Sequence, residues 1–236
     1  MNQSEMGHHT WRGNPDWRSL REPSWLMLRG LSKALNRWAG QIRGDVLDYG
    51  CGGMPYRRFF THCTSYVGAD FASNCDADML LEPGKPLPLD SSSVDAVIST
   101  QVLEHVRDPG PYLAECRRVL RPEGWLLLST HGFYTWHGPG DWRRWTHEGL
   151  IYDIESAGFQ VLDLDAICVQ RAFFLQFMNH TVFSRLLNHS LTSPLGTLLV
   201  SATNALGSLF PSEILARSVR EGTHLGFCYV IVARPR

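Results

Sequence analysis

Residues 45–53 constrain the fold of this chain most, because a short apolar strand there leads directly into a cluster of glycines. The segment is Asp-Val-Leu-Asp-Tyr-Gly-Cys-Gly-Gly, and a second short strand at 66–70 ends on an acid, Asp70. Glycine lets backbone amides approach a ligand that a Cβ would keep away. A carboxylate about twenty residues after such a turn is typical of sites that hold ribose hydroxyls. The pair predicts a nucleotide-like cofactor; a plain tight turn is the alternative.

Short apolar strands alternate with helical segments along the chain. Helices are expected at 18–39, 111–120 and 147–157, and further strands at 77–81, 94–100, 125–130, 159–168 and 227–233. Several of these strands are apolar throughout, which indicates a parallel sheet covered by helices on both faces. In such a sheet the carboxyl ends of the strands form the ligand crevice. The glycine turn, Asp70 and Thr100 all fall at that edge.

Charge is distributed unevenly, although the formal net charge of the whole chain is only -1. Residues 1–45 carry +3, residues 46–165 carry -8, and residues 166–236 carry +4. A nucleic-acid-binding protein would need a surplus of Lys and Arg, so no nucleic-acid partner is expected. The six cysteines include no C-x-x-C pair, and the amino terminus lacks the apolar segment of a secretion signal. We therefore expect a reduced, cytoplasmic protein without a metal site.

Three linked motifs suggest a family. They are V-L-D-x-G-C-G at 46–52, L-P-L-D-x-S-x-x-D-x-V-I-x-x-x-V-L-E-H-V at 87–106, and R-R-V-L-R-P-E-G-W-L-L-L-S-T at 117–130. Over residues 44–165 the chain resembles the class I S-adenosylmethionine-dependent methyltransferases. The resemblance implies an α/β fold, Rossmann-like and doubly wound, with a mostly parallel seven-stranded sheet. It also implies S-adenosylmethionine as the cofactor.

The resemblance assigns cofactor contacts residue by residue. The methionine end would lie against the turn, the ribose on Asp70, the adenine beside Phe71 and Glu82, and the sulfonium above the loop after the fourth strand. The implied contacts are Asp48, Tyr49, Gly50, Cys51, Gly52, Asp70, Phe71, Glu82, Thr100, Gln101 and Val102. Met54 stands where the family usually has a third glycine. A nicotinamide oxidoreductase, which shares the fold, remains an alternative, but its G-x-G-x-x-G pattern is incomplete here.

Methyl transfer to a hydroxyl additionally needs a base for the departing proton. His137 is the first candidate, with Asp141 orienting its ring, and His131 directly after the fifth strand is the second. The alternative is that His137 and Asp141 only brace the loop. His105 is interpreted as structural, and the aromatic side chains of the loop, Trp136 and Trp142 foremost, suit stacking on a sugar or a flat acceptor.

Residues 50–60 and 137–146 additionally resemble bacterial methyltransferases of cell-surface glycan and natural-product pathways. The sequence therefore predicts O-methylation of a small-molecule or glycan-type acceptor. A lipid-linked acceptor, whose carrier would be anionic and apolar, is one form of this prediction. A non-catalytic cofactor-binding scaffold or partner subunit is the second hypothesis, since a cofactor pocket does not establish an acceptor site.

Residues 186–212 contain no Asp, Glu, Lys or Arg, yet include too many polar residues for a membrane span. Helices are expected at about 171–187 and 195–209, forming a lid, a homodimer face or a surface that touches a membrane peripherally, flanked by arginines. The chain thus divides into a helical cap at 1–43, a cofactor-binding core at 44–170, a helical insertion at 171–222, and the final strand at 223–236. The flanking basic residues are Arg171, Arg185, Arg217 and Arg220.

Overall fold

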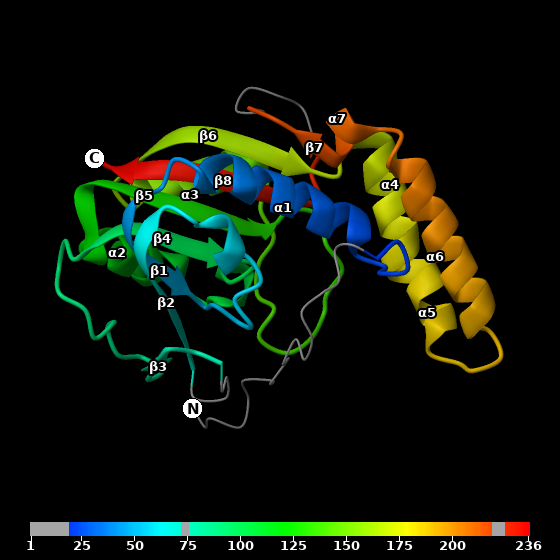
Figure 1. Cartoon of the computed structure of the whole chain (residues 1–236), viewed down its shortest axis with the longest axis horizontal. Coiled ribbons are helices and arrows are strands. Elements are labelled where there is room, and N and C mark those ends of the chain that lie inside the picture. The colour runs from blue at the N-terminus through cyan, green and yellow to red at the C-terminus, as the bar shows by residue number, and fades with distance from the viewer. Residues whose placement is uncertain (1–18, 72–75, 219–224) are drawn as a thin grey trace.

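The computed structural model describes residues 19–71, 76–218 and 225–236, and these contain an eight-stranded sheet covered by helices (Figure 1). Arg220 and the start of the amino-terminal cap lie outside these residues. The strands are β1 (Gly44–Tyr49), β2 (Cys63–Phe71), β3 (Met79–Leu81), β4 (Val94–Thr100), β5 (Leu120–His131), β6 (Phe159–Ile167), β7 (Leu215–Ala216) and β8 (Cys228–Pro235).

The strand order is β3-β2-β1-β4-β5-β8-β6-β7. β3, β2, β1, β4 and β5 pair in parallel, whereas β8 pairs antiparallel with both β5 and β6. The expected Rossmann-like, mostly parallel sheet is confirmed. The sheet has one strand more than the seven predicted. The additional strand, β7, has two residues and pairs with β6 at the edge, and it is too short to show a hydrophobic pattern in the sequence.

Helices occur close to the predicted segments, with one difference at the amino terminus. The helices are α1 (Trp25–Ala39), α2 (Pro109–Val119), α3 (His147–Ser156), α4 (Gln170–Met178), α5 (Ser184–Leu187), α6 (Ser193–Gly207) and α7 (Pro211–Ile214), with short 3-10 helices η2 (Arg57–Phe59) and η3 (Leu103–His105) and a π-helical turn η4 (Asn179–Phe183). α1 begins at Trp25 rather than residue 18, because a residue that precedes a proline, here Glu22 before Pro23, disfavours helical backbone angles.

Two hydrophobic cores lie on opposite faces of the sheet. Leu47 of β1 faces one core with Leu113 of α2 and Ile154 of α3. Its neighbour Val46 faces the other core with Leu31 of α1, since successive side chains of a strand point to opposite faces. All five side chains are buried. This arrangement produces the doubly wound architecture and leaves the carboxyl edge of the parallel strands to irregular loops.

Capped helix starts delimit the two loops at that edge. The Asp108 side chain accepts a hydrogen bond from the Gly110 N–H (3.3 Å) at the start of α2. The Thr146 hydroxyl accepts one from the Gly149 N–H (3.1 Å) at the start of α3. Such caps satisfy backbone donors that a helix leaves unpaired. The loops before the caps, 101–108 and 132–146, therefore end at defined points.

Between β6 and β8 the chain forms a helical hairpin, in which α4, η4 and α5 run one way and α6 returns. Figure 1 shows the two arms side by side, extending beyond the sheet next to the start of α1. The buried amides of Asn179 and Asn204 are hydrogen-bonded across the arms (2.8 Å), and the Asn204 amide also donates to the carbonyl of Leu20 (2.8 Å). Among the described residues, none of the helices has both the length and the apolar character that crossing a bilayer requires.

Candidate active site

In the turn after β1, Gly50 and Gly52 have backbone angles that favour glycine. Gly50 has φ +80°, and a Cβ there would lie 2.5 Å from a methyl of Val102. Gly52 has φ +50°, with open space where its Cβ would point. Met54, in place of the usual third glycine, adopts the same left-handed region at φ +50°. The turn therefore keeps backbone angles that favour glycine although its third glycine is absent.

Asp70, at the end of β2, lies directly against this turn. Its carboxylate accepts hydrogen bonds from the backbone N–H groups of Gly52 (3.0 Å) and Phe71 (2.8 Å). Phe71 is partly exposed beside it. Glu82 follows β3 at the same edge, where its exposed carboxylate forms an ion pair with Lys85 (2.6 Å). The fold thus brings Asp70, Phe71 and the turn together, with Glu82 one strand further out.

Asp48 is buried beneath the turn and has one unsatisfied oxygen. The Tyr66 hydroxyl donates a hydrogen bond to Oδ2 (2.6 Å), whereas none of the residues that the structure describes donates to the buried Oδ1. Burial is the main cause that raises the pKa of Asp48 to about 7; the Tyr66 hydrogen bond opposes the shift, and the nearby Asp70 charge adds to it. A buried oxygen without a donor is costly unless a ligand supplies one. This position therefore fits the cationic methionine end of the cofactor that the resemblance implies.

Tyr49 and Cys51 contribute backbone rather than side chain to the turn. The Tyr49 ring stacks on Tyr112, with centroids 4.5 Å apart, and joins the core beneath α2. The Cys51 side chain is buried, and its thiol lies beside Gly68 of β2. Both side chains thus anchor the turn to the sheet.

The loop after β4 lies next to the turn. Gln101 has φ +56°; its backbone N–H donates to the Ser129 carbonyl (3.0 Å), and its side chain donates to the Ser129 hydroxyl (2.9 Å). A methyl group of Val102 packs against Gly50, where it leaves no room for a Cβ. Thr100, Gln101 and Val102 thus share the crevice edge with the turn, as the sequence predicts, and they lead into η3.

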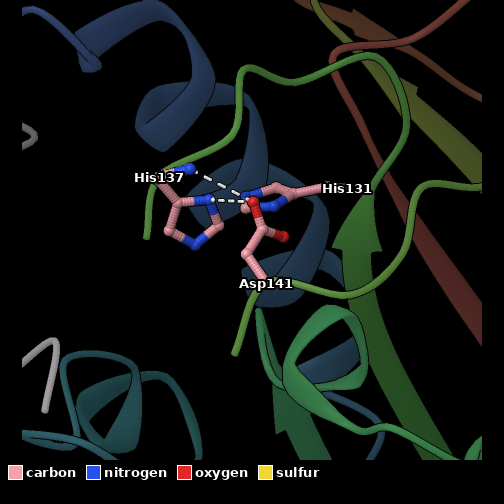
Figure 2. A group of neighbouring side chains, drawn as sticks. All are labelled: His131, His137 and Asp141. Atoms are coloured by element: carbon pink, nitrogen blue, oxygen red, sulfur yellow. Dashed lines mark hydrogen bonds and ion pairs between the residues drawn. The ribbon is translucent and has the colours of Figure 1, made fainter. Parts of the chain in front are cut away.

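His137 and Asp141 meet in the loop after β5 (Figure 2). The His137 Nδ1 lies 3.0 Å from Asp141 Oδ2, and the His137 backbone N–H donates to the same oxygen (3.1 Å). Arg144 binds both oxygens of the Asp141 carboxylate. Burial opposes ionisation of Asp141, but the Arg144 guanidinium outweighs it and lowers the pKa of Asp141. Burial lowers the pKa of His137, against the attraction of Asp141, so its ring is neutral at pH 7.

His131 lies under this loop rather than at its surface. Its buried ring stacks on Tyr134, with centroids 3.9 Å apart, and its Nδ1 lies 3.3 Å from Oε1 of the fully buried Glu104. Burial lowers the pKa of His131 and raises the pKa of Glu104 to about 7. The Thr130 hydroxyl donates to the other oxygen of Glu104 (2.8 Å). His131 thus belongs to a buried polar group that supports the loop.

His105 is the residue that sequence reasoning undervalued. Its Nδ1 lies 3.1 Å from the Gly140 carbonyl, which agrees with the structural role expected for it. However, its Nε2 lies 3.2 Å from Nε2 of His137. The signal was available, since His105 lies within the L-E-H-V segment that follows the cofactor loop, but a contact over 32 residues depends on how the two loops fold.

His131, His137 and Asp141 each offer a ligand atom within 4.8 Å of the others, a spacing that suits a metal ion. Arg144, however, already binds the Asp141 carboxylate, and its positive charge would oppose a second cation there. Charge thus favours an anchored, hydrogen-bonded imidazole over a metal centre.

Comparison with known proteins agrees with this geometry. Residues 47–128 match the family model described as a methyltransferase domain. The chain therefore carries a class I S-adenosylmethionine-dependent methyltransferase domain, and S-adenosylmethionine is the cofactor of that family. The nicotinamide oxidoreductase, which shares the general fold, is accordingly not supported.

Two curated relatives indicate the range of similar proteins. A probable S-adenosylmethionine-dependent methyltransferase of Mycolicibacterium smegmatis is 39% identical over an alignment covering 54% of this chain and 55% of the relative. A ubiquinone biosynthesis O-methyltransferase of Thiobacillus denitrificans is 31% identical, covering 54% and 60%. The chain thus spans little more than half the length of the curated relatives it matches.

Solved structures support the fold over most of the chain. A possible histamine N-methyltransferase of Thermotoga maritima superimposes with a TM-score of 0.54 at 16% identity, covering 90% of this chain and 93% of that one. The [4+2]-cyclase SpnF has a TM-score of 0.53 at 19% identity, covering 87% and 79%. At this identity the likeness concerns the fold alone, and these two names differ in reaction.

Proposed function

We propose that this protein transfers the methyl group of S-adenosylmethionine to an oxygen of a small-molecule or glycan-type acceptor, with His137 as the base. One observation carries the proposal: the His137 imidazole, 3.0 Å from the Asp141 carboxylate, also lies 3.2 Å from His105, which follows the loop expected to pass beneath the sulfonium. The curated relatives named for ubiquinone biosynthesis O-methylation are consistent with an oxygen acceptor.

The bound cofactor supplies an electrophilic methyl group, so the protein must mainly align an acceptor and accept its proton. His137 suits proton acceptance because its Nδ1 faces Asp141, which accepts hydrogen bonds only. In the tautomer that is protonated at Nδ1, the lone pair lies at Nε2, which is 3.2 Å from the Nε2 of His105, and this lone pair takes the proton of the hydroxyl.

His105 makes proton uptake at this nitrogen more favourable. The Gly140 carbonyl can only accept, so His105 donates from Nδ1 and presents a lone pair at Nε2. Two lone pairs therefore face one another across 3.2 Å while both rings are neutral. One proton between them forms an N–H···N hydrogen bond, and the Asp141 carboxylate balances its charge. The pair thus acts as a built-in acceptor for the proton that the hydroxyl loses.

The acceptor itself would meet an aromatic surface. Trp136 and Trp142 are exposed on the same loop as His137. Indole faces stack on the apolar face of a sugar or on a flat ring, which is the class of acceptor proposed here. Phe133, by contrast, packs against Phe173 of α4 (5.3 Å between centroids) and ties the loop to the helical hairpin.

The test begins with an acceptor identified as a mass gain of one methylene in cell extracts supplied with the protein and cofactor. His137→Gln is then expected to lower kcat by about 100-fold to 10,000-fold, with cofactor affinity unchanged, because it removes a general base. His189→Gln, an exposed histidine on the turn of the hairpin, is the matched control and should keep full turnover. Near-normal turnover of His137→Gln would rule out the base assignment.

A non-catalytic cofactor-binding scaffold is the second candidate, because the fold does not by itself establish methyl transfer: a protein named as a cyclase shares it. Under that hypothesis the protein binds S-adenosylmethionine, but no extract yields a methylated product.

A further inference from the structure

The helical hairpin presents an exposed apolar surface that the catalytic proposal does not use. It consists of Phe174, Met178 and Val182 on the first arm, and Leu195, Leu198 and Leu206 on α6; we call these six side chains the hairpin surface. Phe174 is 67% exposed and Leu198 is 64% exposed. Within each arm these residues are three or four positions apart, except that Leu198 and Leu206 are about two helical turns apart. Such spacings place the side chains of one arm along one side of its helix.

The opposite sides of both arms are committed to packing within the hairpin. Gly196, Val200 and Asn204 of α6 are buried, and a Cβ at Gly196 would lie 2.9 Å from Leu186 of the other arm. Asn204 also reaches Asn179 across the hairpin. The arms are therefore fixed to each other by their inner sides, and their apolar outer sides are left to another partner.

The turn of the hairpin extends this surface. Leu191, between α5 and α6, is 95% exposed. A single exposed leucine is ordinary, whereas seven exposed apolar side chains on two adjacent arms and their turn indicate an interaction site. Figure 1 shows that this turn lies at the end of the arms far from the sheet, where it is the part of the hairpin that projects furthest.

Charge distinguishes between the partners that such a surface fits. Residues 166–212 contain no Asp or Glu, and their two basic residues are Arg171 and Arg185. Arg171 is neutralised by Glu213 at the base of the hairpin. Arg185 is exposed near the turn, and within the part of the chain that the structure describes no carboxylate forms an ion pair with it. It follows Phe174, Met178 and Val182 along the same arm.

This pattern fits an anionic lipid surface better than a second copy of the chain. A self-complementary interface brings the same patch of both copies together, and this patch has no acid to pair with Arg185. In a bilayer, the apolar side chains enter the boundary between headgroups and acyl chains while a basic side chain meets anionic headgroups. No helix in the described residues is able to span the bilayer, so the contact would be peripheral.

We infer that the hairpin surface, with Leu191 and Arg185, binds the interface of a bilayer that contains anionic lipids. This inference goes beyond methyl transfer and does not depend on it, because membrane binding is measured without cofactor or acceptor.

The experiment is cosedimentation of the full chain with vesicles of phosphatidylcholine alone or mixed with phosphatidylglycerol. We expect binding to the mixed vesicles that weakens as salt is raised. Leu191→Asp combined with Leu198→Asp should reduce partitioning at least about tenfold, because two exposed leucines lose their apolar contact. Arg185→Glu should weaken binding to mixed vesicles by about fivefold or more and leave binding to neutral vesicles unchanged.

Tyr152→Asp is the control, because Tyr152 is 71% exposed on α3, on the other face of the sheet. It should bind vesicles as the unchanged chain does, and circular dichroism with thermal melting verifies that every variant is folded. Absence of vesicle binding by the unchanged chain overturns the inference. If, in addition, sedimentation velocity shows a dimer that the double aspartate variant abolishes, the hairpin surface is an interface with a second copy of the chain.

Discussion

Asp48 is a single residue on which burial and cofactor binding act in opposite directions. Burial raises its pKa to about 7, while a cationic ligand beside the unsatisfied Oδ1 would favour the ionised form. Because the pKa of this carboxyl is raised in the folded state, its contribution to stability is fully present below about pH 4 and is lost as the pH rises through 7. The folded apoprotein therefore gives up stability to keep a carboxylate ready for the cofactor.

Cofactor affinity should consequently depend on pH near neutrality. We expect the Kd for S-adenosylmethionine to increase about tenfold from pH 8 to pH 6, as Asp48 becomes protonated. Isothermal titration measures this. Asp48→Asn should bind weakly with a Kd that is flat over this range, and it should melt at a higher temperature than the unchanged chain at pH 8. A Kd of the unchanged chain that does not vary with pH would contradict the role assigned to Asp48.

At the scale of elements, the buried amide side chains of Gln176 and Asn204 attach the hairpin to the segment around the start of α1, and Asn204 also joins the two arms. The Asn204 amide donates to the carbonyls of Leu20 (2.8 Å) and Glu22 (3.0 Å), and its oxygen accepts from Asn179. All three contacts are made by one fully buried residue in the middle of an uncharged helix. The segment before α1 and the two arms of the hairpin therefore depend on the same side chain.

Asn204→Ala should destabilise the protein by about 2–4 kcal/mol, because it leaves several buried polar groups without partners. Urea unfolding gives the free energy, and hydrogen exchange should show faster exchange in α6 and just before α1. Ala205→Ser, at the next and exposed position of α6, is the control and should change the free energy by less than about 0.5 kcal/mol. Equal exchange in both variants would disprove the attachment.

At the scale of the whole molecule, the cofactor crevice exists only because separate elements converge. The turn after β1, the acid at the end of β2 and the loop after β4 meet at one edge, where Gly52 contacts Asp70 and Gly50 lies against Val102. The rings of Tyr134 and His180 lie 4.6 Å apart and join the loop 132–146, which carries the proposed base, to the hairpin.

Binding of a ligand across this crevice should stabilise the whole fold. S-adenosylmethionine or its demethylated product, at about 100 times its Kd, is expected to add about 2.7 kcal/mol to the free energy of unfolding. Thermal melting with and without ligand detects the change. Asp70→Ala should remove most of this stabilisation while leaving the melting of the apoprotein almost unchanged, because its carboxylate is at the crevice edge. Equal stabilisation of both proteins would mean that Asp70 does not hold the ligand.

Sequence patterns sufficed for the parts of this protein that local physics controls. Apolar strands, the glycine turn, the acid after β2 and the two arms of the hairpin follow from periodicity and backbone preference, and the structure has them near the predicted residues. The cofactor edge could be predicted as well, because parallel strands carry their carboxyl ends to the same side of a sheet. The two-residue strand β7 could not be predicted, because its pairing with β6 depends on the neighbouring strand and not on a pattern in its own sequence.

Only the tertiary structure decided how the loops at that edge meet. His105 and His137 approach to 3.2 Å although they are 32 residues apart, and Arg144 forms an ion pair with Asp141. His131, the second candidate in the sequence, is buried beside Glu104. Sequence lists the ionisable side chains of a loop, but burial and the partner across the crevice set their protonation, and both arise from packing between distant segments.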